Sequence, residues 1–190
     1  MSYFREPTTD QLVRAVPGAG LDVPIWVLGS SLFGAQLAAM LGLPFAFASH
    51  FAPALLSQAV ETYRSRFQPS EHSDKPYVML GLTVVAADSD EEAEWLFTSL
   101  QQTFVNLRRG RPTQVPPPSR EFESELTPLD RAQLDSVLSH AIVGSPETVR
   151  AGLKRFVSQT GADELIIASQ LFDHATRLRS YEIVAEIRAT

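Results

Sequence analysis

The sequence contains no cysteine, which excludes disulfide bridges, thiolate metal sites and cysteine nucleophiles. It also lacks an excess of basic residues, because 22 Asp and Glu outnumber 16 Lys and Arg and leave a formal net charge of -6. We expect no nucleic-acid partner, since a protein that follows a phosphate backbone needs clustered positive charge. A cytoplasmic location fits the missing cysteines best, because disulfides persist in oxidising compartments.

Apolar runs long enough to span a membrane are lacking too. Residues 23–60 carry no Asp, Glu, Lys or Arg, but Pro44, Pro53 and several glycines interrupt them. A membrane helix needs about 20 continuous apolar residues, and the first ten residues lack the apolar core of a signal peptide. We therefore expect no membrane segment and no export signal, and we interpret the uncharged stretch as the buried interior of an α/β protein.

The stretch from residue 24 to 49 has the pattern of a β-α-β unit. Residues 25–29 form an apolar run, residues 32–41 have helical spacing that stops at Gly42, and residues 44–48 form a second apolar run. Because a helix joins the two predicted strands, we expect them to be parallel.

The remaining sequence continues this alternation. It predicts strands at 77–86 and 164–168, and helices at 53–67, 90–107, 129–138, 146–160 and after Asp173. Alternation of this kind indicates either an open doubly wound sheet or part of a (β/α)8 barrel. A complete barrel needs about 250 residues, so 190 residues with four predicted strands amount to half a barrel.

A proline-rich segment from Arg108 to Pro128 interrupts the pattern. It contains Pro116, Pro117 and Pro118 and predicts a long irregular loop. Loops of this length are commonly lids or linkers. Arg108, Arg109 and Arg111 stand beside it, either as a solvated charge run or as residues that reach an anion when the loop closes.

The first candidate site is the junction from Gly29 to Gly34, where a strand ends and a helix begins. Free backbone N–H groups, the helix dipole and the hydroxyls of Ser30 and Ser31 favour an anion such as a phosphate there, and Gly34 lets a ligand approach the backbone. The alternative is that one of the two serines only caps the helix, and the spacing does not decide between them.

Two familiar motifs do not fit this junction. A dinucleotide site expects an acidic residue at the end of the next strand, which ends instead in Ala48-Ser49-His50. A hydrolase nucleophile elbow expects G-x-S-x-G, and Phe33 stands where the second glycine belongs.

His50 is the second candidate, because it follows the carboxyl end of a predicted parallel strand, where α/β proteins place their ligands. The alternative is a histidine hydrogen-bonded in a loop. His72 and His140 lie in connecting segments, while His174 could face the same rim, and none of the four histidines has the spacing of a metal ligand. We therefore expect no metal site. We expect the following aromatic residues to be core or strand-face residues, with packing on a flat ring near a strand end as the alternative: Trp26, Phe45, Phe47 and Phe51.

Four segments in combination resemble the bacterial luciferase-like flavin monooxygenases. They are PIWVLGSSLFGAQLAAMLGLPFAFASHF, PYVMLGLTVVAADSDEEAEWL, VGSPETVRAGLKRF and GADELIIASQLFDHATRLRSYEIVAE. The resemblance implies a (β/α)8 TIM barrel and a flavin cofactor, FMN or, in one branch, a deazaflavin. It also implies that reduced flavin, supplied by a separate flavin reductase, reacts with O2 to oxidise a small organic substrate.

Carried over by position, the resemblance implies that Ser30, Ser31 and Gly34 hold the flavin phosphate. It places Ala48, Ser49 and His50 near the flavin ring, with His50 as the candidate catalytic residue, and residues 108–128 as a loop that closes over the site. The match covers the fifth to eighth strands of the barrel, so we expect residues 1–190 to form one truncated domain.

A half-barrel leaves two sheet edges and its inner face uncovered, and the apolar runs 25–28 and 45–47 make this exposure costly. We expect a second copy of the chain or a complementary N-terminal half to cover them. The leading interpretation is an FMN-dependent monooxygenase. A catalytically silent flavin-binding or assembly module is the alternative, and an unrelated phosphate-binding α/β protein is the third.

Overall fold

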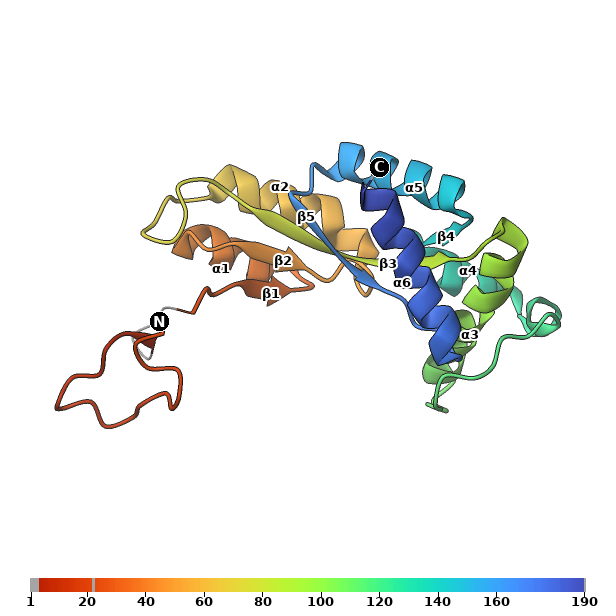
Figure 1. The fold of residues 1–190 in the computed structure, drawn as a ribbon, viewed down its shortest axis with the longest axis horizontal. Helices are drawn as coiled ribbons and strands as arrows, with labels where there is room; N and C mark the ends of the chain where they lie inside the picture. The colour runs from red at the N-terminus through yellow and green to blue at the C-terminus, as the bar shows by residue number, and fades with distance from the viewer. Residues whose placement is uncertain (1–3, 22, 190) are drawn as a thin grey trace.

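The computed structural model describes residues 4–21 and 23–189, which form a parallel sheet with helices packed along it (Figure 1). The elements follow in the order β1 (Val27–Gly29), α1 (Leu32–Leu41), β2 (Phe45–Phe47), the 3-10 helix η2 (Pro53–Leu55), α2 (Leu56–Arg66), β3 (Val78–Ala86), α3 (Asp90–Arg108), the 3-10 helix η3 (Phe122–Glu125), α4 (Pro128–Val137), β4 (Ile142–Gly144), α5 (Pro146–Thr160), β5 (Glu164–Ala168) and α6 (His174–Ala189). The prediction that the first ten residues hold no export signal falls in part on residues 1–3, which lie outside the described residues.

Every strand pair of the sheet is parallel. β1 pairs with β2, β2 with β3, and β3 with both β5, along Met79–Thr83, and β4, along Val84–Ala86. The predicted parallel β-α-β unit is therefore confirmed. β4 is a fifth strand that the sequence did not predict.

The main core lies between the sheet and its helices. Phe45 and Phe47 are almost fully buried against the small residues of α1 and against Tyr63 of α2, and the same cluster continues to α5 and α6. The prediction of core positions for these two phenylalanines is confirmed. Phe51 is 59% exposed instead, because it lies in the turn after β2 and not in the strand.

The other face of the sheet, which we call the open face, is uncovered along β1 and β5. Leu28 is 72% exposed and Ile166 is 56% exposed, whereas their strand neighbours Val27, Leu165 and Ile167 pack into the core. Side chains alternate between the two faces of a strand, so Leu28 and Ile166 point away from the helices. β2, which we also expected to be exposed, has all three of its residues buried.

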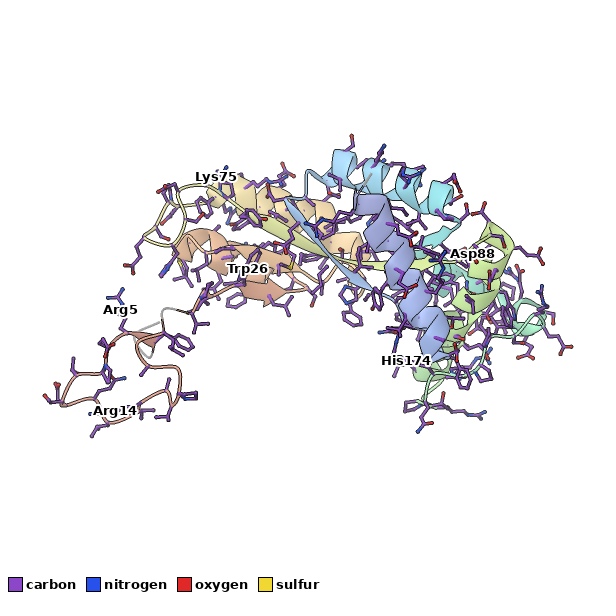
Figure 2. The ribbon with its side chains drawn as sticks, viewed as in Figure 1. Arg5, Arg14, Trp26, Lys75, Asp88 and His174 are labelled. Atoms are coloured by element: carbon purple, nitrogen blue, oxygen red, sulfur yellow. The ribbon has the colours of Figure 1, made fainter. Side chains whose placement is uncertain are left out.

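The segment before β1 contributes little to this body. Residues 4–21 form a loop that projects away from the sheet, with Arg5 and Arg14 upon it (Figures 1 and 2). Leu12 and Val16 on this loop are 99% and 87% exposed. The fold is therefore built by the residues from β1 onward.

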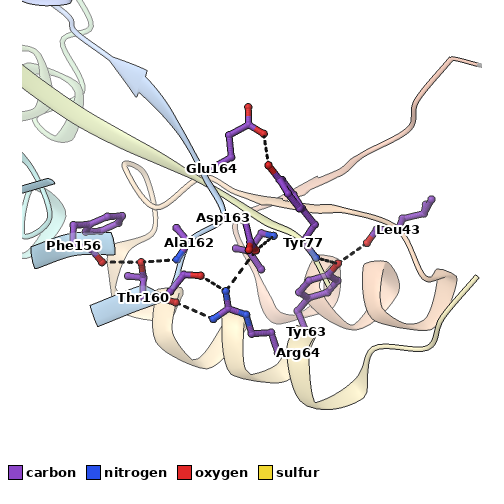
Figure 3. Close-up of polar contacts among 11 residues, drawn as sticks. Leu43, Tyr63, Arg64, Tyr77, Phe156, Thr160, Ala162, Asp163 and Glu164 are labelled. Carbon is purple, nitrogen blue, oxygen red and sulfur yellow. Dashed lines mark hydrogen bonds and ion pairs between the residues drawn. The ribbon is translucent and has the colours of Figure 1, made fainter. Parts of the chain in front are cut away.

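The edge of the sheet where the strands begin is held by a polar network (Figure 3). Arg64 of α2 donates to the backbone oxygens of Thr160, at 3.0 Å, and Gly161 at the end of α5. Asp163 accepts from the Val78 backbone N–H at 2.8 Å, and the Tyr63 hydroxyl donates to the Leu43 oxygen at 2.9 Å. These contacts tie α2, α5, β3 and β5 together, so this edge is structural.

Candidate functional site

The junction between β1 and α1 leaves a serine hydroxyl unused. Ser31 is the N-cap residue of α1, yet within the described part of the chain its side chain makes no capping hydrogen bond. The caps of α3, α4 and α5 each accept such a bond, through Ser89, Thr127 and Ser145. The alternative that Ser31 serves as an ordinary hydroxyl cap is therefore not what the structure shows.

The charge around this helix start also differs from that of α3, α4 and α5. The first turns of α3, α4 and α5 contain acidic residues, whereas the first turn of α1, like those of α2 and α6, contains none. Ser30 and Ser31 are both exposed. Free N–H groups, a positive dipole end and a hydroxyl without a nearby carboxylate are the features of an anion-binding helix start.

Gly34 has a packing role that the sequence analysis did not foresee. A Cβ on Gly34 would lie 3.3 Å from the Gly29 Cα and 3.6 Å from the Phe45 ring. Gly34 itself is buried, so its missing side chain lets α1 pack closely on the end of β1. Contact of Gly34 with a ligand stays a prediction.

The second candidate segment lies beside the first, because β1 and β2 end at the same edge of the sheet. The register pairs Gly29 with Phe47, and the Ala48 N–H donates to the Gly29 oxygen at 2.9 Å. Ser49 is buried and its hydroxyl donates to the Gly81 oxygen. The structure thus brings Ser30 and Ser31 and the three residues after β2 to one edge, which we call the carboxyl edge.

His50 lies on β3. A Cβ on Gly81 would clash with the His50 Nδ1 and would lie 2.6 Å from its Cε1, so the imidazole occupies the space that a side chain at Gly81 would fill. The Phe51 ring lies 4.2 Å from the imidazole, centroid to centroid. Burial lowers the pKa of His50 below its ordinary value of 6.5, and the Gly81 backbone beside the ring opposes this only in part.

Gly81 and Thr83 are site residues that the sequence analysis missed. Thr83 is 7% exposed and lines a narrow closed space together with Ser49 and His50. The available signal was Gly81 itself, because an isolated glycine inside a strand commonly marks close approach of another group.

The predicted lid segment packs along α3. Gln102 donates to the Pro117 oxygen at 2.9 Å, and the Arg120 guanidinium lies 5.6 Å from the Trp95 ring centre. The residues that close over His50 come later, from the end of α4 and the loop to β4: Val137, Leu138, His140 and Ala141. Closure of residues 108–128 over a ligand stays a prediction.

The arginines and the other histidines that the sequence offered as candidates have partners of their own or lie exposed on the surface. Arg109 forms an ion pair with Asp130 at 2.7 Å, which gives it a structural partner, and Arg108 and Arg111 are exposed. His72 lies 3.6 Å from Glu71 on the surface, and His174 contacts Arg177 at 2.7 Å. Within residues 4–21 and 23–189, no three His, Asp or Glu side chains gather as a metal site would require.

Two larger cavities lie away from Ser30 and Ser31. One, of about 1160 Å³, lies between α5, α6 and β5, and the other, of about 560 Å³, lies between α3 and the segment that leads into α4. The serines stand at an open surface instead. Among the described helices, none combines the length and the hydropathy needed to cross a lipid bilayer.

Comparison with known proteins shows the family of the chain. The model of the luciferase-like monooxygenase family matches residues 2–164. A luciferase-like monooxygenase of Escherichia coli strain K12 is 49% identical over 188 residues, which are 99% of this chain and 56% of that protein. The chain therefore spans about half the length of the curated relatives it matches.

Solved structures show the same fold. The crystal structure of apo-MsnO8 is 29% identical and superposes with a TM-score of 0.77, over 96% of this chain and 56% of that one. The oxygenating constituent of the 3,6-diketocamphane monooxygenase of Pseudomonas putida, solved in complex with FMN, is 21% identical with a TM-score of 0.56, over 86% of this chain and 47% of that one. The first likeness confirms the predicted partial barrel, and the second concerns the fold alone. The chain belongs to the luciferase-like monooxygenase family.

Proposed function

We propose that the chain forms the part of an FMN-dependent monooxygenase that holds the flavin phosphate. The observation that carries this proposal is Ser31, an N-cap residue whose hydroxyl caps nothing, at a helix start without acidic residues. A phosphate is the anion that such a helix start binds most readily. Because the chain belongs to the luciferase-like monooxygenase family, we take this phosphate to be that of a flavin cofactor.

The residues of the carboxyl edge fit the rest of a flavin as well. Phe33 and Phe51 are 72% and 59% exposed near the two strand ends, so aromatic surface is available for a flat ring. The imidazole of His50 supplies a polar group beside it, and the buried Ser49, whose hydroxyl donates to the Gly81 oxygen, holds the backbone next to that imidazole. In this arrangement Ser30 and Ser31 bind the phosphate, and Ala48, Ser49 and His50 orient the ring.

A bound reduced flavin would supply the reaction with O2 that oxidises a small organic substrate, and a separate flavin reductase would supply its electrons. The chain's own contribution is to hold the cofactor and to exclude water from it. A deazaflavin is the second candidate cofactor. A phosphate site suits it equally, so direct comparison of the two cofactors is needed to choose between them.

Binding and turnover measurements test the proposal in two steps. Titration with oxidised FMN should quench flavin fluorescence and raise the melting temperature of the protein. Reduced FMN from an added reductase, with O2 and a panel of small organic compounds, should then yield an oxygenated product. Binding without any product would favour the silent flavin-binding or assembly module. No effect of FMN or deazaflavin on fluorescence or melting would refute the proposal in favour of an unrelated phosphate-binding protein.

The proposal includes a partner that completes the site. The chain spans about half of its relatives, and its sheet has an uncovered face with exposed Leu28 and Ile166. A second copy of the chain, or a separate N-terminal half, would cover this face and close the other side of the cofactor space.

A further inference from the structure

The contact between His50 and Gly81 is specific to a glycine. The Nδ1–Cε1 edge of the imidazole stands where the Cβ of any other residue at position 81 would be. Ser49 fixes the neighbouring backbone, because its buried hydroxyl donates to the Gly81 oxygen. The end of β2 and the middle of β3 are thus joined so that one ring orientation is available to His50.

The buried edge of this ring is unusual because it lacks a hydrogen-bond partner. Among residues 4–21 and 23–189, no donor or acceptor pairs with the His50 Nδ1, although that atom is buried. More than nine in ten buried polar groups in proteins have a partner, and the exceptions call for an explanation. Because this edge stands against Gly81, a ligand can reach only the rest of the half-buried ring, so a hydrogen bond to a ligand would come from Nε2.

The surroundings keep this histidine uncharged. His140 is the one other titratable side chain among the residues that line the space around it, which are Ser49, Thr83, Val137, Leu138, His140 and Ala141. Burial lowers the pKa of His50, so the ring is neutral near pH 7. A neutral imidazole donates one hydrogen bond and accepts another. With Nδ1 against Gly81, Nε2 is the ring nitrogen left to contact a carbonyl or N–H group of a flavin ring.

We propose that Gly81 is a positioning residue that seats the His50 imidazole on β3, so that His50 contacts the ring of the bound flavin. This inference rests on the proposed function, since it assigns a residue to one part of the same cofactor. It divides the site into two regions. Ser31 acts on the phosphate, while His50, placed by Gly81, acts on the ring that FMN and riboflavin share.

A double-mutant cycle tests whether Gly81 positions the His50 imidazole. Gly81→Ala puts a methyl group where the imidazole lies, so it should weaken binding of both FMN and riboflavin about tenfold, the loss expected for one hydrogen bond. His50→Ala should cause a similar loss. Because the clash needs the ring, the Gly81→Ala/His50→Ala double variant should bind flavin no more weakly than His50→Ala alone.

Two controls separate positioning from general damage. His50→Gln keeps a donor and an acceptor and should recover part of the affinity, and His72→Ala, at an exposed histidine, should change nothing. The imidazole pKa gives a readout without flavin. Nuclear magnetic resonance should find His50 titrating below 6.5 in the wild-type protein and returning toward that value in Gly81→Ala, whose ring is displaced into water.

The outcomes distinguish this inference from the proposed function. If the wild-type protein binds neither FMN nor deazaflavin, both are wrong. If it binds FMN and Gly81→Ala keeps its affinity for FMN and riboflavin, the assignment of Gly81 and His50 is overturned and the phosphate site stands. If the losses of flavin affinity from Gly81→Ala and His50→Ala add in the double variant, the positioning role of Gly81 is also contradicted, because the two residues would act independently.

Discussion

Asp130 shows how a single side chain fastens the long segment before α4 to the rest of the molecule. Its carboxylate accepts hydrogen bonds from the Arg109 guanidinium at 2.7 Å and from the Thr127 hydroxyl at 2.6 Å and backbone N–H at 3.0 Å. These donors, Arg109 above all, lower the pKa of Asp130 from 3.8 to about 2. The sequence left Arg109 either solvated or near an anion, because residues 21 positions apart reveal no pairing without a fold.

The lowered pKa of Asp130 predicts a pH dependence of stability. The native state binds this proton less tightly than the unfolded chain, so the stabilisation is complete above pH 4 and is lost as the pH falls toward 2. Asp130→Asn should lower the melting temperature at pH 7 and flatten the acid part of its pH profile. Asp135→Asn, at an exposed position of the same helix, is the matched control. Equal profiles for wild type and Asp130→Asn would contradict this role.

At the scale of elements, the helix ends were the most predictable part of the fold. The sequence predicted helices at 90–107 and 146–160, and the structure has them at Asp90–Arg108, capped by Ser89, and at Pro146–Thr160, capped by Ser145 and Gly161. Gly42 ends α1 with a positive φ of 61°. β4 escaped prediction, because its pairing with Val84–Ala86 comes from the tertiary fold and not from a local pattern.

Two glycines with similar backbone angles separate strain from crowding. Gly42 has φ 61° and a Cβ there would lie 2.5 Å from the Ser70 Cβ, whereas Gly110 has φ 72° and no described atom within 4 Å of such a Cβ. Gly110→Ala should cost about 1 kcal/mol of unfolding free energy, for the left-handed conformation alone. Gly42→Ala should cost more, about 2 to 3 kcal/mol, because crowding adds to it. Urea unfolding measures both, and equal losses would show that crowding at Gly42 is relieved without cost.

For the whole molecule, the open face is the feature that sets this chain apart from a closed barrel. Leu28 and Ile166 are exposed on it, and the Tyr77 hydroxyl donates to Glu164 at 3.3 Å on the neighbouring strands. The sequence predicted an uncovered inner face from the number of strands alone. The large residues of β2, Phe45 and Phe47, face the helices and are buried, and β2 presents only the small Ala46 to the open face, where β1 presents Leu28.

We expect the open face to be an association surface. Leu28→Lys should shift the protein toward monomer in sedimentation, because it places a charge in the apolar contact, without changing the helical signal in circular dichroism. Leu107→Lys, at a leucine of α3 that is 58% exposed outside the open face, is the control. A wild-type protein that sediments as a stable, well-folded monomer would contradict the expectation.

The candidate site was only partly predictable for the same reason. The spacing of Ser30, Ser31 and His50 located two strand ends, and parallel pairing made their approach a consequence of the fold. The packing role of Gly34 and the contact between Gly81 and His50 depend on distances between residues far apart in the chain. The sequence could therefore predict that these residues share one edge of the sheet, but it could not predict the residues that pack against them.

The measurement that tests the phosphate site most directly compares FMN with riboflavin, which lacks the phosphate, in the wild-type protein and in Ser31→Ala. Isothermal titration should show that Ser31→Ala weakens FMN about tenfold, as expected for one hydrogen bond to a charged group, and leaves riboflavin unchanged. Equal losses for the two ligands, or no loss for either, would show that the start of α1 does not hold the flavin phosphate.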